Sequence, residues 1–280
     1  MRFIFSTGSL YTYGIDRCFE LAAAAGFDGI ELMVDARWDT RQPDHLRRLI
    51  DRYSLPIDTL HTPFSPVPGW PAPEAERIQH TLRLAETLGA NTVVHHLPIR
   101  YGYFAIQLPG QFLHLPWPIH PDPGYVRWVG NDYAALQSQT DVWLCVENMR
   151  AHRLFGRPVR RLHHWNTPAE LTRFPRLTMD TTHLGTWGLD PVEVYAQWGE
   201  RVGHVHLSNF DGREHRRPEA GQLRLDALLH AMAANGYNRA ICFELHPDAL
   251  DAGQPDAHLV SLLTESLAYC RAALQVATGQ

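Results

Sequence analysis

The chain contains no lysine, because all 25 of its basic residues are arginine. A catalytic Schiff base and a lysine general base are therefore both excluded. Cysteine is also scarce, and its four residues stand far apart without forming a Cys-x-x-Cys pair. We expect reduced thiols in the core of a cytoplasmic protein, with no role in a disulfide or a zinc–cysteine site. The four residues are Cys18, Cys145, Cys242 and Cys270.

A positive excess of charge and a long apolar run are missing as well. The formal net charge is −5, so no broad positive surface is expected for nucleic acid or an anionic membrane. The apolar start of the chain, Arg2–Ser6, is too short for a secretory signal, and no later segment is long enough to cross a bilayer. Neither a nucleic-acid partner nor a membrane is expected.

The chain also lacks the glycine-rich turn that binds dinucleotide phosphates. Its first predicted strand is followed by Thr7-Gly8-Ser9 and not by G-x-G-x-x-G. What is present is an alternation of short β-rich runs with longer amphipathic ones, which is typical of parallel βα units. The predicted strands are Arg2–Ser6, Gly29–Val34, Ile57–Thr62, Thr92–His96, Val142–Asn148, Leu177–Asp180, Gly203–Ser208 and Ala240–Leu245.

Helical patterns follow most of these strands. One helix is expected to open with Pro73 and to stop at Gly89, and Asn166–Glu170 is a strong helix start. Eight strands with helices between them, in 280 residues, predict an α/β fold of the (β/α)₈ (TIM) barrel type. We expect a single domain over residues 1–280. Other predicted helices are Ile15–Ala25, Leu223–Asn235 and about 257–277.

Acidic and histidine side chains stand at the ends of most predicted strands. In a (β/α)₈ barrel these ends meet at one face, which is where active sites form. Strand alternation puts Cys145 with Glu147, and Cys242 with Glu244, on faces that can point into the barrel. The residues at the strand ends are Glu31, His61, His95, His96, Glu147, Asp180, His206 and Glu244.

Such a group of side chains predicts a bound cation. Carboxylates that converge in a barrel repel one another unless protons or a cation neutralise them. Three carboxylates and one imidazole form a mixed oxygen and nitrogen set that suits Mn²⁺, Co²⁺, Mg²⁺ or Zn²⁺. The sequence therefore predicts one divalent metal ion at the open end of the barrel.

Seven segments, spread over nearly the whole chain, resemble the xylose isomerase-like barrel superfamily. They are GFDGIEL, LHTPF, VVHHL, LCVENM, LTMDTTHLG, VGHVHLSNFDG and ICFELHP. That superfamily contains sugar isomerases and epimerases, sugar-acid dehydratases and endonuclease IV-type nucleases. The resemblance implies that Glu147, Asp180, His206 and Glu244 hold the metal. As in its ketose 3-epimerase branch, it also implies that Glu147 and Glu244 are catalytic and move a proton, while His183 contacts the substrate.

Other residues near the strand ends are candidate substrate contacts. His61 has three open interpretations, namely a substrate contact, a ligand of a second metal and a buried neutral imidazole. His96 matches the family's histidine better than His95 does, although alternation puts the two on opposite faces. Glu31 is interpreted as a wall of the site, with a structural hydrogen bond as the alternative. His204 is expected to fill the barrel.

Two predicted connections at the open end are unusually long. Residues 97–130, rich in proline and aromatics, are interpreted as a lid that closes over the mouth and sets substrate choice, and residues 150–165 are rich in arginine. After the seventh strand, Arg213 and His215 are each interpreted as holding an anionic substrate group, with a solvated loop as the equal alternative. The aromatic residues of the first connection are Tyr101, Tyr103, Phe104, Phe112, Trp117 and Trp128.

The leading functional hypothesis is a metal-dependent isomerase or epimerase of a small sugar, sugar phosphate or keto-sugar. The reaction would transfer a proton through an enediolate. The alternative is a metal-dependent dehydratase of a keto-sugar or keto-acid, which begins with the same proton abstraction. Nothing in the sequence separates the two. A homo-oligomer is possible in either case.

A further alternative is an endonuclease IV-like enzyme that cleaves DNA at abasic sites. The histidines His61, His96, His183 and His215 favour it, because that branch uses matching histidines for additional zinc ions. Arg213 opposes it, because the branch has an aspartate two residues before its last loop histidine. The acidic net charge opposes it as well. A barrel that only binds a ligand is disfavoured by the full set of metal ligands.

Overall fold

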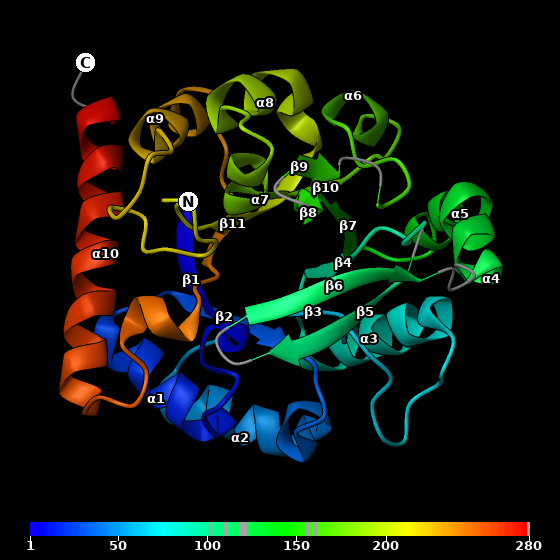
Figure 1. The fold of residues 1–280 in the computed structure, drawn as a ribbon. Helices are drawn as coiled ribbons and strands as arrows, with labels where there is room; N and C mark the ends of the chain where they lie inside the picture. Colours follow the sequence, from blue (N-terminus) through cyan, green and yellow to red (C-terminus); the bar gives the residue numbers. More distant parts are fainter. Residues whose placement is uncertain (101, 109–110, 118–121, 155–156, 160–161, 279–280) are drawn as a thin grey trace.

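The structure is a computed structural model that describes residues 1–100, 102–108, 111–117, 122–154, 157–159 and 162–278. Within these ranges, side chains are described for all residues except those in 101–121, 153–161 and 276–280. Its centre is a closed barrel of eight parallel strands (Figure 1). In order around the barrel these are β1 (Arg2–Ser6), β2 (Gly29–Met33), β3 (Ile57–His61), β4 (Thr92–His95), β7 (Trp143–Glu147), β10 (Leu177–Asp180), β11 (Val202–Leu207) and β12 (Ala240–Phe243).

Helices lie around the outside of this barrel (Figure 1). The predicted (β/α)₈ fold is therefore confirmed, and the predicted strands agree with the observed ones to within two residues at each end. The long C-terminal helix packs against both α1 and α9 and closes the outer layer. The longer helices are α1 (Ile15–Ala25), α2 (Pro43–Tyr53), α3 (Glu74–Leu88), α8 (Pro191–Trp198), α9 (Leu225–Ala234) and α10 (Asp256–Thr278).

Local signals in the sequence account for where helices begin and end. Gly89 ends α3 in the left-handed region, at φ 75°, and its N–H is donated to the carbonyls of Ala85 and Glu86. Pro73 precedes α3 as its N-cap, one position earlier than the first helical turn that we predicted for it. In α6 (Pro168–Leu171) the side chain of Thr167 accepts from the backbone N–H of Glu170, and the Glu170 carboxylate accepts in return, which confirms the predicted start.

The inside of the barrel changes from apolar at one end to polar at the other. Near the N-terminal end, Gly203 lets β11 approach β7, because a Cβ there would lie 2.7 Å from the ring of Trp143 and 2.9 Å from the sulfur of Cys145. All four cysteines are buried and free, as predicted. Toward the C-terminal end the inward side chains are carboxylates and imidazoles, most of them fully buried. The strands therefore bring the polar residues to one mouth.

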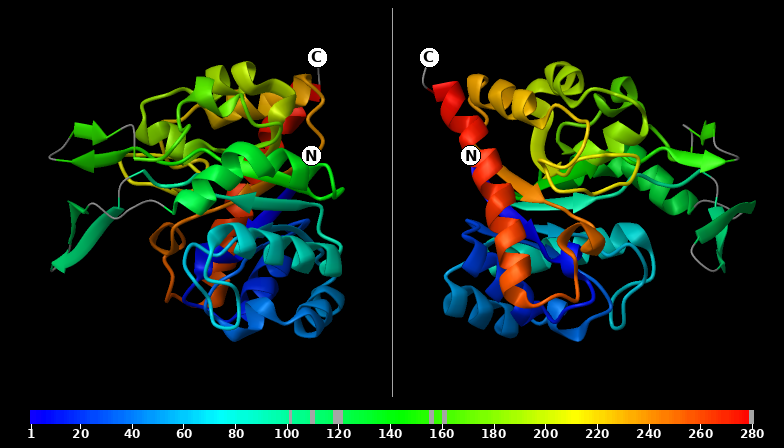
Figure 2. Two further views of the ribbon diagram at one scale, coloured as in Figure 1. Left: turned by 90° about the vertical axis from the view of Figure 1, so that its right-hand side faces the viewer. Right: turned by 60° about the vertical axis from the view of Figure 1, so that its left-hand side comes forward.

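Two β-hairpins project from this mouth as separate arms (Figure 2). The first pairs β5 (Gly102–Leu108) with β6 (Gln111–Trp117), and the second pairs β8 (His152–Leu154) with β9 (Arg157–Val159). They occupy the two connections that the sequence showed to be long.

The aromatic residues that we predicted as a lid divide into two groups. The side chains of Tyr101, Tyr103, Phe104, Phe112 and Trp117 lie outside the described residues. The sixth, Trp128, stacks on Tyr125 of α4 (Pro123–Arg127) and packs against the outer core. Closure of a lid remains a prediction. Within the described part of the chain, none of the helices combines the length and the apolar character needed to span a bilayer.

Candidate metal centre

The four predicted metal ligands come together at the C-terminal end of the barrel. Glu147 and Asp180 are the last residues of β7 and β10, His206 is next to last in β11, and Glu244 directly follows β12. The strand register places Asp180 beside His206. One ligand atom from each of the four lies within 4.8 Å of the others. Glu244 exposes 14% of its side chain, while the other three are almost wholly buried.

The donor chemistry of this group fits a divalent cation. Asp180 Oδ1 accepts a hydrogen bond of 2.8 Å from the backbone N–H of His183, whereas its Oδ2 is buried and accepts none. Nδ1 of His206 lies 3.1 Å from Glu244 Oε2 and 3.4 Å from Glu147 Oε1. Three carboxylates at these distances, two of them fully buried, require positive charge, and a mixed oxygen and nitrogen set matches the preference of Mn²⁺, Co²⁺, Mg²⁺ and Zn²⁺.

The shifted pKa values in the four-residue group also indicate that its carboxylates need a positive charge nearby. Burial raises the pKa of Asp180 well above its usual value, and the charges of Glu147 and Glu244 raise it further against the effect of His183. Burial by itself lowers the pKa of His206, but the neighbouring carboxylates outweigh it and raise that pKa well above the usual value. In the absence of a cation, these surroundings therefore favour the protonated forms of Asp180 and His206, and a bound metal would compete with those protons.

His61 and His96 lie on one side of Glu147. Nε2 of each ring is 3.2 Å from Glu147 Oε2. Nδ1 of His61 lies 2.8 Å from the carbonyl oxygen of Thr62, so that its N–H is donated to the backbone and Nε2 is left for the site. His61, His96 and Glu147 form a second group whose ligand atoms lie within 4.8 Å of one another.

His183 and His215 lie on the other side, next to Asp180, and form a third such group with it. Nδ1 of His183 is 2.8 Å from the carbonyl oxygen of Asn148 and 3.4 Å from Asp180 Oδ2. Burial lowers the pKa of His183, but the charges of Asp180 and Glu147 outweigh it and raise that pKa to about 10. His215 Nδ1 lies 3.1 Å from the carbonyl oxygen of Glu244. The structure thus brings both histidines to the site.

The structure also distinguishes His95 from His96. His95 is buried on the outer side of β4, where its Nδ1 lies 3.1 Å from the hydroxyl of Tyr125 and its ring contacts Tyr133. Burial lowers the pKa of His95 to about 3, so that it is neutral. His96 faces Glu147 and the site, and the ring of Phe64 stacks on it at 4.7 Å.

Glu31 lies beneath the four-residue group and not at its surface. Its Oε2 is 2.8 Å from His204 Nε2 and 3.1 Å from His206 Nε2, and its side chain is wholly buried. Burial raises the pKa of Glu31, but His206 and His204 outweigh it and hold that pKa well below its usual value. Glu31 therefore supports His206 from below, which is the structural hydrogen bond that we gave as the alternative to a wall. His204 fills the barrel interior, as expected.

Above the group lies a cavity of about 670 Å³, which we call the site cavity. Arg213 lines it from the rim, with its side chain 72% exposed and paired with Asp211 at 2.7 Å. Phe64 and Arg216 are among the lining residues that sequence reasoning missed. Phe64 closely follows the end of β3, a position that could have indicated it. Arg216 is buried, and its Nε donates to the carbonyl oxygen of Glu214 at 3.3 Å.

This arrangement defines a class of protein, namely a TIM barrel with a carboxylate and imidazole group at the C-terminal ends of its strands. The chain belongs to the xylose isomerase-like TIM barrel family, whose model matches residues 19–270. The resemblance that we inferred from the seven segments is thereby confirmed.

Relatives and solved structures cover almost the whole chain. "Uncharacterized protein ML2432" of Mycobacterium leprae and "Uncharacterized protein Rv0498" of Mycobacterium tuberculosis are each 27% identical to it over 95% of both chains. A D-tagatose 3-epimerase-like protein has a similar structure, with a TM-score of 0.66, 19% identity and coverage of 99% and 98% of the two chains. The 3-keto-D-glucoside 4-epimerase YcjR of E. coli has a TM-score of 0.67, 18% identity and coverage of 97% and 99%. At these identities the structures show a shared fold.

Proposed function

We propose that the chain is a divalent-metal-dependent isomerase or epimerase of a small sugar, sugar phosphate or keto-sugar. The observation that carries the proposal is that Glu147 and Glu244 both belong to the four-residue group and both line the site cavity. A cavity of about 670 Å³ is ample for a small ligand. The sugar epimerases among the proteins of similar fold support this choice of substrate class.

Glu147, Asp180, His206 and Glu244 would hold the cation. When bound, it would hold two neighbouring oxygens of the substrate and polarise its carbonyl. One of the two glutamates would take the proton from the carbon beside that carbonyl, and the other, or the same one, would return it. Burial raises the pKa of Glu244, but the charge of His206 outweighs it and lowers that pKa to about 2. Glu244 is therefore ionised while His206 carries its proton, and a bound cation would likewise favour the carboxylate form that a general base needs.

The histidines around the group would position the substrate. His61, His96 and His183 present ring nitrogens within 3.3 Å of Glu147 oxygens, so hydroxyl groups that approach Glu147 meet hydrogen-bonding partners on both sides. Holding the substrate in one orientation decides which carbon faces a glutamate. Arg213 and His215 line the other part of the same cavity.

Proton exchange with solvent tests this function. Metal-loaded enzyme incubated in D₂O with its keto-sugar should place deuterium at the carbon beside the carbonyl. Glu244→Gln should reduce the exchange roughly a hundredfold or more, because a general base is lost. The metal content of each sample must be measured, so that loss of the base is separated from loss of the ion.

Two results would contradict the proposal. A lack of exchange in every keto-sugar tried, with metal bound, would exclude the isomerase. Loss of water from the substrate, detected by mass after the same exchange, would identify the dehydratase instead.

The second candidate is the endonuclease IV-like nuclease. The observation that favours it is the pair of flanking groups, because one shares Glu147 and the other shares Asp180 with the four-residue group. Arg213 still opposes it, since its guanidinium is paired with Asp211 and supplies no metal ligand. Elemental analysis of protein purified without chelator distinguishes the two, because one ion per chain supports the isomerase. Three zinc ions per chain, together with cleavage of DNA at an abasic site, would support the nuclease.

A further inference from the structure

The exposed apolar side chains of this protein gather at the mouth of the barrel. In the part of the chain that the structure describes, four large apolar side chains are exposed, and each of them lines one of three adjoining cavities, the first of which lies above the candidate metal centre. They are Tyr11 at 55%, Trp38 at 64%, Phe64 at 61% and Ile99 at 42% exposure. Exposed apolar surface concentrated in one place marks a contact site.

These cavities adjoin one another, because successive ones share lining residues, and we call the series the groove. A middle cavity of about 560 Å³ shares Phe64, His215 and Glu244 with the site cavity. An outer cavity of about 640 Å³ shares Tyr11 and Arg37 with the middle one. The groove therefore begins at a proposed catalytic carboxylate and continues along aromatic side chains. A single sugar ring above the four-residue group would leave the middle and outer cavities unfilled.

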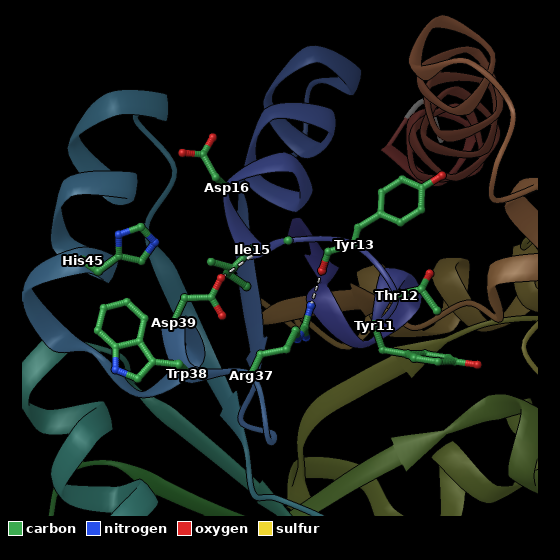
Figure 3. Close-up of a pocket in the computed structure, with 10 residues that line it drawn as sticks. Tyr11, Thr12, Tyr13, Ile15, Asp16, Arg37, Trp38, Asp39 and His45 are labelled. Carbon is green, nitrogen blue, oxygen red and sulfur yellow. Dashed lines mark hydrogen bonds between the residues drawn. The ribbon is translucent and has the colours of Figure 1, made fainter. Parts of the chain in front are cut away.

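The outer end of the groove is held in place by hydrogen bonds (Figure 3). Arg37 donates from Nη1 to the carbonyl oxygen of Tyr13 at 2.8 Å and from Nε to Asp35 at 2.8 Å. Asp39 accepts from the backbone N–H of Ile15 at 3.4 Å. Figure 3 shows Tyr11 on one side of Arg37 and Trp38 on the other. The surface between the aromatic rings is thus prepared before any ligand binds.

The composition of the groove indicates what it binds. Its lining combines aromatic side chains with polar ones. This combination suits a sugar ring, whose C–H faces pack on aromatics while its hydroxyls form hydrogen bonds. Asp16, Asp35 and Asp39 line the middle and outer cavities against the single guanidinium of Arg37. An anionic group would be repelled there. A purely apolar group would desolvate these charges without replacing their hydrogen bonds.

We propose that the substrate is a two-ring sugar, with the reacting keto-sugar above the metal centre and an uncharged second sugar ring in the groove that Tyr11 and Trp38 line. This inference rests on the proposed function. The second ring adds binding energy away from the reacting carbon, and it selects linked sugars over free ones.

The test compares the affinities of a keto-sugar and its disaccharides for the metal-loaded protein. D-fructose is the single-ring probe, and turanose, maltulose and isomaltulose are the two-ring probes, because they link glucose to different positions of fructose. We expect at least one disaccharide to bind about tenfold tighter than fructose by calorimetry. Saturation-transfer NMR should show its glucose ring in contact with the protein.

Variants at the aromatic residues test whether the groove causes the preference for the disaccharide. Tyr11→Ala and Trp38→Ala should bring the affinity for the disaccharide down to that for fructose, without changing the latter. Tyr11→Phe, which keeps the ring, should retain the preference. Ile99→Ala removes an exposed apolar side chain elsewhere at the mouth and should leave the ratio of the two affinities unchanged.

Three results would overturn the proposal. The first is that no disaccharide binds tighter than fructose. The second is that the alanine variants weaken fructose and the disaccharides equally. The third is that they turn an oligomer into a monomer without changing sugar preference, which would make the face an interface between copies. If no keto-sugar binds or exchanges a proton at all, the proposed function itself has failed, whereas binding and exchange of fructose without a preference contradict only this inference.

Discussion

At the scale of single residues, the candidate metal centre depends on contacts between buried carboxylates and the imidazole of His206. Glu31 lies below His206 and accepts from its Nε2, while Nδ1 of the same ring faces Glu147 and Glu244. One imidazole thus joins a carboxylate in the barrel interior to the group at the mouth. A carboxylate on the far nitrogen fixes which ring nitrogen is free to bind a metal.

Glu31→Gln tests this support. We predict that it lowers affinity for a divalent ion roughly ten- to a hundredfold, because a neutral amide holds the His206 tautomer less firmly. Calorimetric titration with Mn²⁺ or Co²⁺ measures the affinity, and the absorption spectrum of bound Co²⁺ reports any change at the ligands. Glu74→Gln, at the start of α3, is the control. Unchanged affinity and spectrum would show that Glu31 acts only in packing.

The shifted pKa values of Asp180 and His206 predict a pH dependence of metal binding. Burial raises the pKa of Asp180, and the carboxylates around His206 overcome burial to raise its pKa. The protonated forms of both groups are therefore favoured in the absence of metal, and an ion that binds them competes with protons, so the affinity should rise with pH. Titration in two buffers of different ionisation enthalpy should reveal proton release. Equal apparent enthalpies would contradict the prediction.

At the scale of elements, barrel strands place the ligands and the connections after them shape the mouth. The ends of β7, β10 and β11, and the residue that follows β12, bring one proposed ligand each. Their positions could be predicted, because parallel strands of a barrel end at the same face. The hairpin β5–β6 could not be predicted, because the sequence of this connection indicated only that it is long and rich in proline and aromatic residues.

Shortening the β5–β6 hairpin tests the predicted lid. Replacing residues 101–119 by a short glycine and serine linker should alter the preference among keto-sugars while leaving the affinity for the metal nearly unchanged. The reason is that the hairpin projects from the mouth, whereas the four ligands lie in the barrel (Figure 2). Calorimetric titrations with the metal and with the keto-sugars measure the metal affinity and the sugar preference. Unfolding of the shortened chain, detected by circular dichroism, would make the segment structural.

At the scale of the whole molecule, the proposed ion couples to folding. The three carboxylates come from β7, β10 and the end of β12, which are brought together only in the folded barrel. An ion that binds them would therefore stabilise the folded state over the unfolded one.

Metal should therefore raise the melting temperature. At a free concentration a hundred times the Kd, the gain is about 3 kcal/mol, or a rise in Tm of about 5 °C for a chain of this size. Scanning calorimetry with and without Mn²⁺, Co²⁺ or Zn²⁺ measures it. Asp180→Asn should lose most of the rise, because it removes a charged ligand. An equal rise in parent and variant would place the binding elsewhere.

The sequence by itself determined the barrel and the candidate ligands. Strand periodicity and helix signals are local, and the convergence of strand ends follows from the fold alone. Only the tertiary structure decided which of His95 and His96 faces the site, because strand β4 ends between them. It alone placed Glu31 against His206, which is 175 residues away along the chain. It also placed Tyr11 and Trp38 along one groove, since such contacts depend on how separate elements pack in space.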